Sequence, residues 1–244
     1  MVWAATLGFT IQILADFSGY TDIARGTARM LGWELMENFR NPYLATSPSD
    51  FWRRWHISFS TWIRDYLYIT FGGSRGGFWR ATLATSAAML ISGLWHGASW
   101  NFVLWGAYHA LLLIGYRLAT PQIPKAIRDS FPGHVAAVVL MFGFTVFGWL
   151  LFRETDVSRI YALLRLSPFA ATPDEWVATT AMLGIAAFAA TPMVLGLLFE
   201  RFVEPRLAPT PWHLPLQTTA WAAFAVCFYL FVRMDAVDFL YFQF

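Results

Sequence analysis

Six stretches of this sequence are long and apolar enough to form membrane-spanning helices, and they limit the possible folds more than any other feature. A helix needs about 20 mostly apolar residues to cross the hydrocarbon core of a bilayer. Because backbone amides cannot stay unpaired in lipid, only helices and closed barrels cross it. The pattern predicts an all-α, multi-pass bundle with spans at residues 2–17, 78–95, 101–116, 135–152, 176–199 and 216–232.

The composition also indicates a membrane protein. Hydrophobic residues make up 57% of the chain and charged residues only 13%, whereas a soluble domain carries about 25% charged residues. A formal net charge of +2 is too small to indicate a nucleic-acid partner. The first stretch has no basic residues before it and leads to no cleavage site, which predicts a retained helix rather than a signal peptide. Cys227, the only cysteine, is interpreted as an apolar packing residue.

The segment from residue 33 to 77 is too polar to cross a bilayer. Ser47, followed by Pro48 and by Asp50 three residues on, predicts the start of a helix. Aromatic residues then recur at steps of three and four, which predicts one amphipathic helix. Such a helix fits an interfacial anchor or the wall of a water-filled cavity. The aromatic stripe consists of Trp52, Trp55, Phe59, Trp62 and Tyr66.

Two histidines, His96 and His109, lie in apolar stretches without a neighbouring carboxylate. An ionisable group at membrane depth usually faces a protein interior or a wet cavity, and an imidazole exchanges protons near neutral pH. Position alone leaves a catalytic role and a packing role open for His96. The glycines on both sides of it, Gly93 and Gly97, predict a bend or a close backbone approach. Together with the small polar residues nearby, which include Ser92, Ser99 and Asn101, they indicate a cavity mouth.

His109 follows His96 at a distance of about 20 Å along a continuous helix and is interpreted mainly as a packing residue. The two imidazoles can form a dyad only if a break near Gly97 folds the chain back. His56 is either an interface residue or a group in the same cavity as His96. No spacing of His and Cys residues predicts a metal site. The string at 71–77 lacks the lysine of a phosphate-binding loop and predicts a basic surface turn.

Several strings resemble the membrane-bound O-acyltransferase (MBOAT) family, in particular its alginate O-acetyltransferase membrane-subunit branch. The most specific are "FWRRWHIS" at 51–58 and "LWHG" at 94–97, which occur in this order about 40 residues apart. The resemblance runs from about Phe9 to Trp105, with a weaker likeness in "FLYFQF" at the C-terminus. It implies that residues 1–244 form one membrane domain that corresponds to the C-terminal half of a family member.

The resemblance implies transfer of an acyl group to a hydroxyl inside a membrane funnel. His96 matches the family's near-invariant histidine and His56 its second polar position; Trp55, Ser58, Trp95, Asn101 and His109 are the expected supporting residues. The implied donor is a thioester, acetyl-CoA or an acyl carrier, with no tightly bound cofactor and no metal. The implied partners are the lipid bilayer and an extracytoplasmic acetyltransferase or acceptor protein, and the implied location is the bacterial inner membrane.

Three alternatives stay open at the level of sequence. Within the family, the transferred group can be D-alanine from a carrier protein, with teichoic acid as the acceptor. The chain can also be an inactive truncated relative. A non-enzymatic transporter or scaffold is disfavoured because transporters are commonly built from two related halves, and no such symmetry is found in the sequence.

Overall fold

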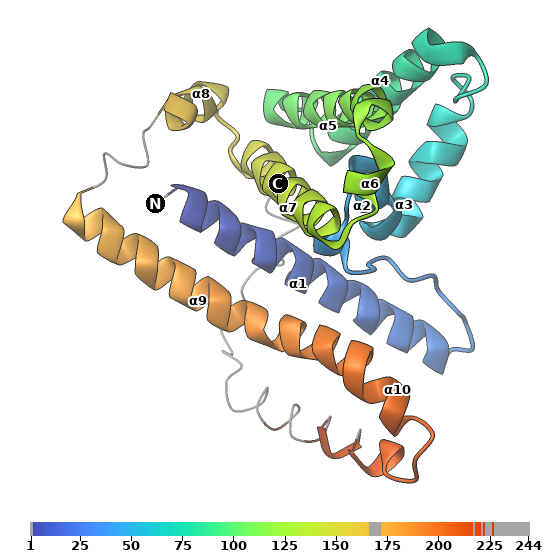
Figure 1. Ribbon diagram of the computed structural model, residues 1–244, viewed down its shortest axis with the longest axis vertical. Coiled ribbons are helices and arrows are strands. Elements are labelled where there is room, and N and C mark those ends of the chain that lie inside the picture. The colour runs from blue at the N-terminus through green and yellow to red at the C-terminus, as the bar shows by residue number, and fades with distance from the viewer. Residues whose placement is uncertain (1, 166–171, 217, 221, 223–225, 227–244) are drawn as a thin grey trace.

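A computed structural model describes residues 2–165, 172–216, 218–220, 222 and 226 (Figure 1). Every regular element in this part of the chain is a helix. The all-α prediction is therefore confirmed for the described residues. The helices are α1 (Val2–Met30), η1 (Pro42–Leu44), α2 (Pro48–Arg54), α3 (Ile57–Trp62), η2 (Ile63–Tyr68), α4 (Gly77–His96), α5 (Trp100–Ala119), η3 (Thr120–Gln122), α6 (Lys125–Arg128), α7 (Phe131–Arg153), α8 (Val157–Arg165), α9 (Pro173–Leu198), η5 (Phe199–Val203) and α10 (Glu204–Leu207).

Two helical stretches among the described residues are long and apolar enough to cross a membrane, Trp100–Gln122 and Phe131–Arg153. Each has 23 residues, which correspond to about 35 Å of helix and exceed the thickness of a hydrocarbon core. The other predicted spans at 2–17, 78–95 and 176–199 coincide with long helices that do not meet this test. Most of the sixth predicted span, at 216–232, lies outside the described residues, and so does Cys227.

Helices α4 and α5 form a tight hairpin closed by three residues, so the chain folds back after His96 as the flanking glycines predict. A Cβ atom at Gly93 would collide with the backbone oxygen of Phe102, and one at Gly106 would collide with the backbone oxygen of Met89. A Cβ atom at Gly97 would lie 2.6 Å from the Phe102 ring. Small residues therefore set the close approach of the two backbones, as is common between helices in membranes.

Of the remaining long helices, α7 packs against this hairpin through α5. Helix α7 contacts both α5 and α1, and α1 lies along α9 (Figure 1). An aromatic core fills the space between α1, α2, α5 and α7, and its members include Phe9, Phe51, Trp105, Trp149 and Phe152. Large aromatic side chains fix a core of this kind through edge-to-face and stacked contacts.

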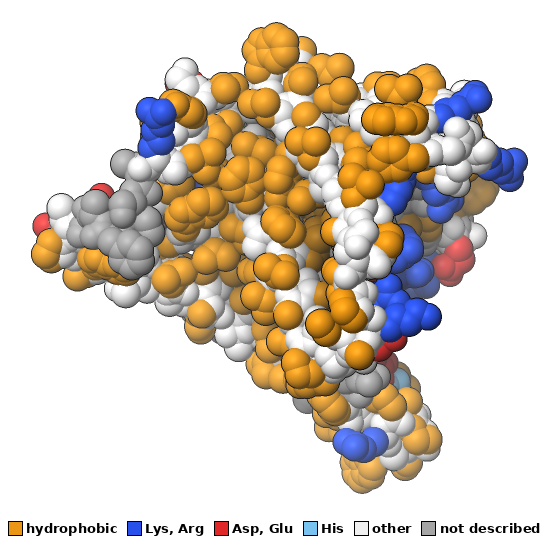
Figure 2. All heavy atoms as spheres, turned by 45° about the horizontal axis from the view of Figure 1, so that its top comes forward, with side chains coloured by type: hydrophobic (Ala, Val, Ile, Leu, Met, Phe, Trp, Pro, Cys, Tyr) orange, Lys and Arg blue, Asp and Glu red, His pale blue; other side chains and the backbone are white. Residues whose placement is uncertain are grey.

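Much of the outer surface is apolar. Figure 2 shows a broad face of hydrophobic side chains, with Lys and Arg gathered in a strip along one edge. Leu111 on α5 is 69% exposed, and Val139 and Leu140 on α7 are each 63% exposed. A contiguous apolar surface of this extent marks a region that meets lipid or another protein.

The predicted start of the amphipathic helix is confirmed, but its single long course is wrong. Ser47 is the N-cap, and its Oγ accepts a hydrogen bond of 3.1 Å from the Asp50 amide. Helix α2 then ends at Arg54, and His56 takes up a left-handed conformation with φ of 44° before α3 begins. The aromatic stripe is divided as a result: Trp55 is buried, whereas Trp62 and Tyr66 are 48% and 64% exposed.

Candidate active site

His96 is the last residue of α4 and lies within a cluster of aromatic rings. Its imidazole centroid lies 5.1 Å from that of Trp105 and 5.0 Å from that of Phe152, both in edge-to-face geometry. Phe59 approaches to 6.0 Å from α3. The hairpin turn after Gly97 thus brings α5, the end of α7 and α3 around one imidazole.

His56 lies at the break between α2 and α3. Its ring packs against Phe17 of α1 at 4.7 Å and Phe59 at 5.1 Å. Burial lowers the pKa of His56 to about 4, so that the imidazole is neutral near pH 7 and has one donor and one acceptor nitrogen. Its Nδ1 lies 3.5 Å from the Ser58 hydroxyl oxygen.

Phe59 and Trp95 connect the two histidines. Phe59 contacts both imidazoles, and the Trp95 centroid lies 5.0 Å from that of His96 and 6.5 Å from that of His56. Trp95 also packs on Phe59 at 4.4 Å and is 56% exposed. Trp95, one of the predicted supporting residues, thus contacts both histidines.

Asn38, which no sequence motif marks, holds the His56 break in place. Its Oδ1 accepts hydrogen bonds from the Ser58 amide at 3.0 Å and from the Ser58 hydroxyl at 2.7 Å. Its backbone oxygen accepts from the Ile57 amide at 3.0 Å. Because the His56 side chain makes no capping bond, Asn38 supplies the cap of α3 from a distant part of the chain.

His109 is 3% exposed and lies in the core rather than beside His96. The Trp105 ring contacts both of these imidazoles, at 5.1 Å from His96 and 4.7 Å from His109. Trp52 also packs on His109, with a centroid distance of 5.1 Å. A Cβ atom at Gly148 of α7 would lie 3.1 Å from the His109 Nε2. His109 is thus enclosed by aromatic rings and by the backbone of α7.

Asn101 and Trp55 lie on the core side of the site. Asn101 is fully buried, and its Nδ2 donates to the backbone oxygens of Phe152 at 3.1 Å and of Leu151 at 3.5 Å. It therefore caps the last turn of α7 and positions the Phe152 ring that contacts His96. Trp55 belongs to the aromatic core, where its ring packs at 4.8 Å from Trp149 of α7 and at 5.8 Å from Phe51 of α2.

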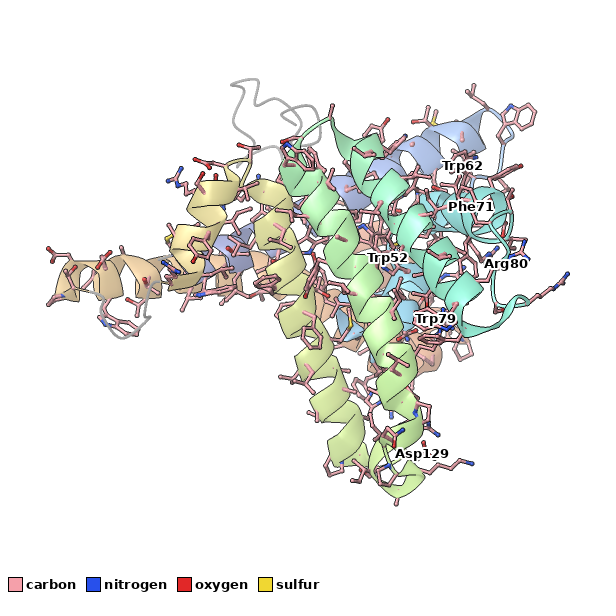
Figure 3. All side chains as sticks on the ribbon, turned by 90° about the horizontal axis from the view of Figure 1, so that it is seen from above. Trp52, Trp62, Phe71, Trp79, Arg80 and Asp129 are labelled. Carbon is pink, nitrogen blue, oxygen red and sulfur yellow. The ribbon has the colours of Figure 1, made fainter. Side chains whose placement is uncertain are left out.

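A cavity of about 640 Å³ opens between α2, α3, η2, α4 and α5. We call it the basic cavity because four arginines and no carboxylate line it. Arg117 makes no ion pair within the described part of the chain, whereas the other three have acidic partners. Figure 3 shows Trp52, one of the lining residues, beneath α4 and α5. The four arginines are Arg40, Arg53, Arg64 and Arg117.

A second space of about 30 Å³, the narrow pocket, continues from the basic cavity. The two share four lining residues: Trp52, Ser60, Ile63 and Met89. The narrow pocket adds Phe59, which touches both His56 and His96, and Ser92.

One face of α4 lines both the basic cavity and the narrow pocket. Thr85 lines the basic cavity, Met89 lines both spaces, and Ser92 lines the narrow pocket. His96 comes four residues after Ser92, and residues spaced by three and four share one face of a helix. The face therefore leads from the arginines to the imidazole of His96.

No group of three or more His, Cys, Asp or Glu side chains suited to hold a metal ion occurs among the described residues. The polar groups near His96 are instead single hydroxyls, indoles and imidazoles. Such groups can exchange protons and donate hydrogen bonds, which are the requirements of general acid–base catalysis.

Comparison with known proteins identifies the family. Residues 1–152 match the membrane-bound O-acyltransferase family. The chain belongs to this family. The match includes every residue of the candidate site named above, so the MBOAT resemblance of the "FWRRWHIS" and "LWHG" strings is confirmed.

Similar MBOAT relatives differ in the reactions for which they are named. The chain is 43% identical over 168 residues to the probable alginate O-acetylase AlgI of Azotobacter vinelandii, covering 66% of this chain and 32% of that protein. It is 34% identical to the peptidoglycan O-acetyltransferase of Helicobacter pylori, covering 67% and 31%. It is 30% identical to the teichoic acid D-alanyltransferase of Bacillus subtilis, covering 59% and 39%. The matched part thus spans about a third of the length of these relatives.

Proposed function

We propose that this chain is a membrane O-acyltransferase subunit that transfers an acetyl group from a thioester to a hydroxyl, for the O-acetylation of an exported polysaccharide such as alginate. The observation that carries the proposal is the α4 face that leads from the basic cavity past Met89 and Ser92 to His96. It offers a route for an anionic donor to a potential base.

In the proposed reaction, His96 is the base. An alcohol is a poor nucleophile until its proton is removed, and an imidazole suits this step. His96 takes the proton of the acceptor hydroxyl while the alcohol oxygen bonds to the thioester carbonyl carbon. The tetrahedral intermediate collapses, the carbon–sulfur bond breaks, and the imidazolium returns the proton to the departing thiolate. The products are an ester and a thiol.

His56 and Trp95 are proposed as supporting residues. Both pack around Phe59, which contacts His96. Because burial keeps His56 neutral, it can hydrogen-bond to the acceptor without adding positive charge beside the base. Ser58 and Asn101 are proposed to position other site residues rather than to contact the substrate, since Ser58 bonds to Asn38 and Asn101 caps α7.

The basic cavity supports a donor with phosphate groups. Arginine guanidinium groups bind phosphates through paired hydrogen bonds, and acetyl-CoA and acyl carriers both bear phosphates next to the arm that carries the thioester. Cytoplasmic surfaces of membrane proteins carry an excess of Lys and Arg. We therefore infer that the basic cavity opens to the cytoplasm of a bacterial inner membrane that the chain crosses several times.

In this proposal α1, α4 and α9 join α5 and α7 as spans around part of a funnel. The acyl group passes through it to an acceptor on the outer side of the membrane, where a partner protein receives it or delivers it to the polymer. The relatives named for alginate, peptidoglycan and teichoic acid reactions mark the range of acceptors to be tested.

Replacement of His96 tests the proposal. We expect His96→Gln to reduce transfer of radiolabelled acetyl from acetyl-CoA to mannuronate oligosaccharides by about 1000-fold or more, at unchanged levels of protein in the membrane. His134→Gln, which changes an exposed histidine at the start of α7, is the matched control. Normal transfer by His96→Gln would contradict the mechanism, and transfer from a D-alanyl carrier but not from acetyl-CoA would favour the D-alanyl alternative.

A further inference from the structure

The narrow pocket has the size of a very small acyl group. Its volume is about 30 Å³, and about 10–15 Å³ of such space holds one water-sized group. It therefore holds about two such groups, which matches the methyl and the carbonyl of an acetyl group. The side chains of Ile63 and Met89 close its wall, and both are buried.

Ser92, which lines this pocket, has a hydroxyl without a hydrogen-bond partner among the described residues. The residue is fully buried. Two other buried hydroxyls on helices bond to the backbone one turn earlier: Thr85 to Ala81 and Thr145 to Met141. The Ser92 hydroxyl does not form this bond, although burial of an unpaired hydroxyl is unfavourable.

A second unpartnered donor belongs to the same wall. Trp52 lines the narrow pocket, and its indole Nε1 is buried without a hydrogen-bond partner within the described part of the chain. It comes from α2, whereas Ser92 comes from α4. A pocket with two unpaired donors and no acceptor bound to them fits a ligand that carries an oxygen acceptor.

We propose that the narrow pocket is the acyl-group pocket and that it selects acetyl over longer acyl groups, with the Ser92 hydroxyl donating a hydrogen bond to the thioester carbonyl oxygen. This inference rests on the proposed acyl transfer. As the alcohol adds to the carbonyl carbon, negative charge builds on that oxygen, and a donor already in place stabilises it. The Trp52 indole N–H supplies the second donor.

The position of Ser92 on α4 suits this role. Residues four apart on a helix have Cβ atoms about 5–6 Å apart, so the pocket lies one turn from His96 on the same face. Phe59 lines the pocket and contacts His96. An acetyl carbon held at Ser92 is thus next to the base that activates the alcohol, while the thioester arm extends back past Met89 into the basic cavity.

Enlargement of the pocket tests the selection of acetyl. Met89→Ala lengthens the pocket, and we expect it to raise the preference for butyryl-CoA over acetyl-CoA in acyl transfer by about 10-fold or more, because each methylene contributes about this factor in an apolar pocket. Met141→Ala removes the same side chain from another buried site, at 3% exposure, and is expected to leave the preference unchanged. Ile63→Val removes one methyl group from the same wall and so enlarges the pocket. It is the alternative variant if Met89→Ala does not accumulate in the membrane.

Removal of the hydroxyl tests the donor. We expect Ser92→Ala to lower kcat for acetyl transfer by about 100-fold at similar KM, as for other donors to a developing oxyanion. Thr145→Val, which removes a buried hydroxyl already bonded to Met141, is expected to retain kcat. Unchanged donor preference in Met89→Ala and Ile63→Val, or unchanged kcat in Ser92→Ala, would overturn the inference while acyl transfer by the unmodified protein still stands. No acyl transfer by the unmodified protein would overturn the proposed function itself.

Discussion

Asn38 determines where the His56 imidazole lies, although it is 18 residues away in the chain. Its side chain accepts both hydrogen bonds from Ser58, and its carbonyl oxygen accepts from Ile57. The left-handed φ of 44° at His56 is uncommon for a residue other than glycine. The Asn38 bonds offset the cost of this conformation and thereby keep the imidazole between Phe17 and Phe59.

Removal of the Asn38 cap should loosen the His56 break. We expect Asn38→Ala to lower the free energy of unfolding by about 1–2 kcal/mol, the usual cost of a lost cap, and to reduce acyl transfer. Asn38→Asp keeps an oxygen acceptor for both Ser58 bonds and should retain most of the stability and most of the acyl transfer. Thermal unfolding in detergent, followed by tryptophan fluorescence, measures the difference. Equal stability of the two variants would show that the Asn38 bonds do not hold the break.

Arg117 provides the second test at this scale, because it is the cavity arginine that pairs with no acidic side chain among the described residues. We expect Arg117→Gln to raise the KM for acetyl-CoA by about 5-fold, since an ion pair of an exposed side chain contributes up to about 1 kcal/mol, and to leave kcat nearly unchanged. Arg128→Gln removes an arginine that pairs with Asp129 at 3.5 Å outside the cavity and is the control. Equal KM values for the two variants would place the donor phosphates elsewhere.

At the scale of elements, the α4–α5 hairpin fixes the relative positions of the basic cavity, the narrow pocket and His96. Gly93 and Gly106 allow the two backbones to touch. This close approach aligns the α4 face with Trp105 on α5, whose ring contacts His96. The hairpin rather than the loops therefore carries the geometry of the site.

A methyl group at the contact should force the two helices apart. We expect Gly93→Ala to destabilise the protein by about 1–3 kcal/mol, as overpacking does in tight cores, and to impair transfer. At Gly115 on α5 a Cβ atom meets nothing within 4 Å, so Gly115→Ala should be neutral or stabilise by about 0.5–1 kcal/mol. Thermal midpoints of the two variants in the same detergent provide the comparison, and equal shifts would contradict the close contact.

The elements also show how far sequence patterns reach. The N-cap at Ser47, the backbone approach at Gly93 and the fold-back after Gly97 follow from local rules and were predictable. The break at His56 was not, because its cause is the distant Asn38 side chain and no glycine or proline marks the position. The sequence places Phe59 in an aromatic stripe and Ser92 near a cavity mouth, but it does not predict that the two line one narrow pocket. That arrangement depends on how α3 and α4 pack together.

At the scale of the whole molecule, basic residues and exposed apolar side chains occupy different parts of the surface. This separation fits a single orientation of the protein in a membrane. Exposed apolar side chains cover α5 and α7, and Lys and Arg gather along one edge (Figure 2). The glycine-rich turn at 69–76 directly follows η2, whose Arg64 and Tyr68 line the basic cavity. The turn and the mouth of the cavity should therefore lie on the same side of the bilayer.

Labelling of single cysteines tests this orientation. In a Cys227→Ser background, a cysteine introduced by Ser74→Cys in the turn should react with a membrane-impermeant maleimide from the cytoplasmic side only. Leu140→Cys, near the middle of α7 and 63% exposed in the protein alone, should react only after detergent is added, because lipid shields it and thiolate formation there is unfavourable. Reaction of Leu140→Cys in intact membranes would exclude α7 as a span. Reaction of Ser74→Cys from the outer side alone would reverse the orientation and place the basic cavity away from a cytoplasmic donor.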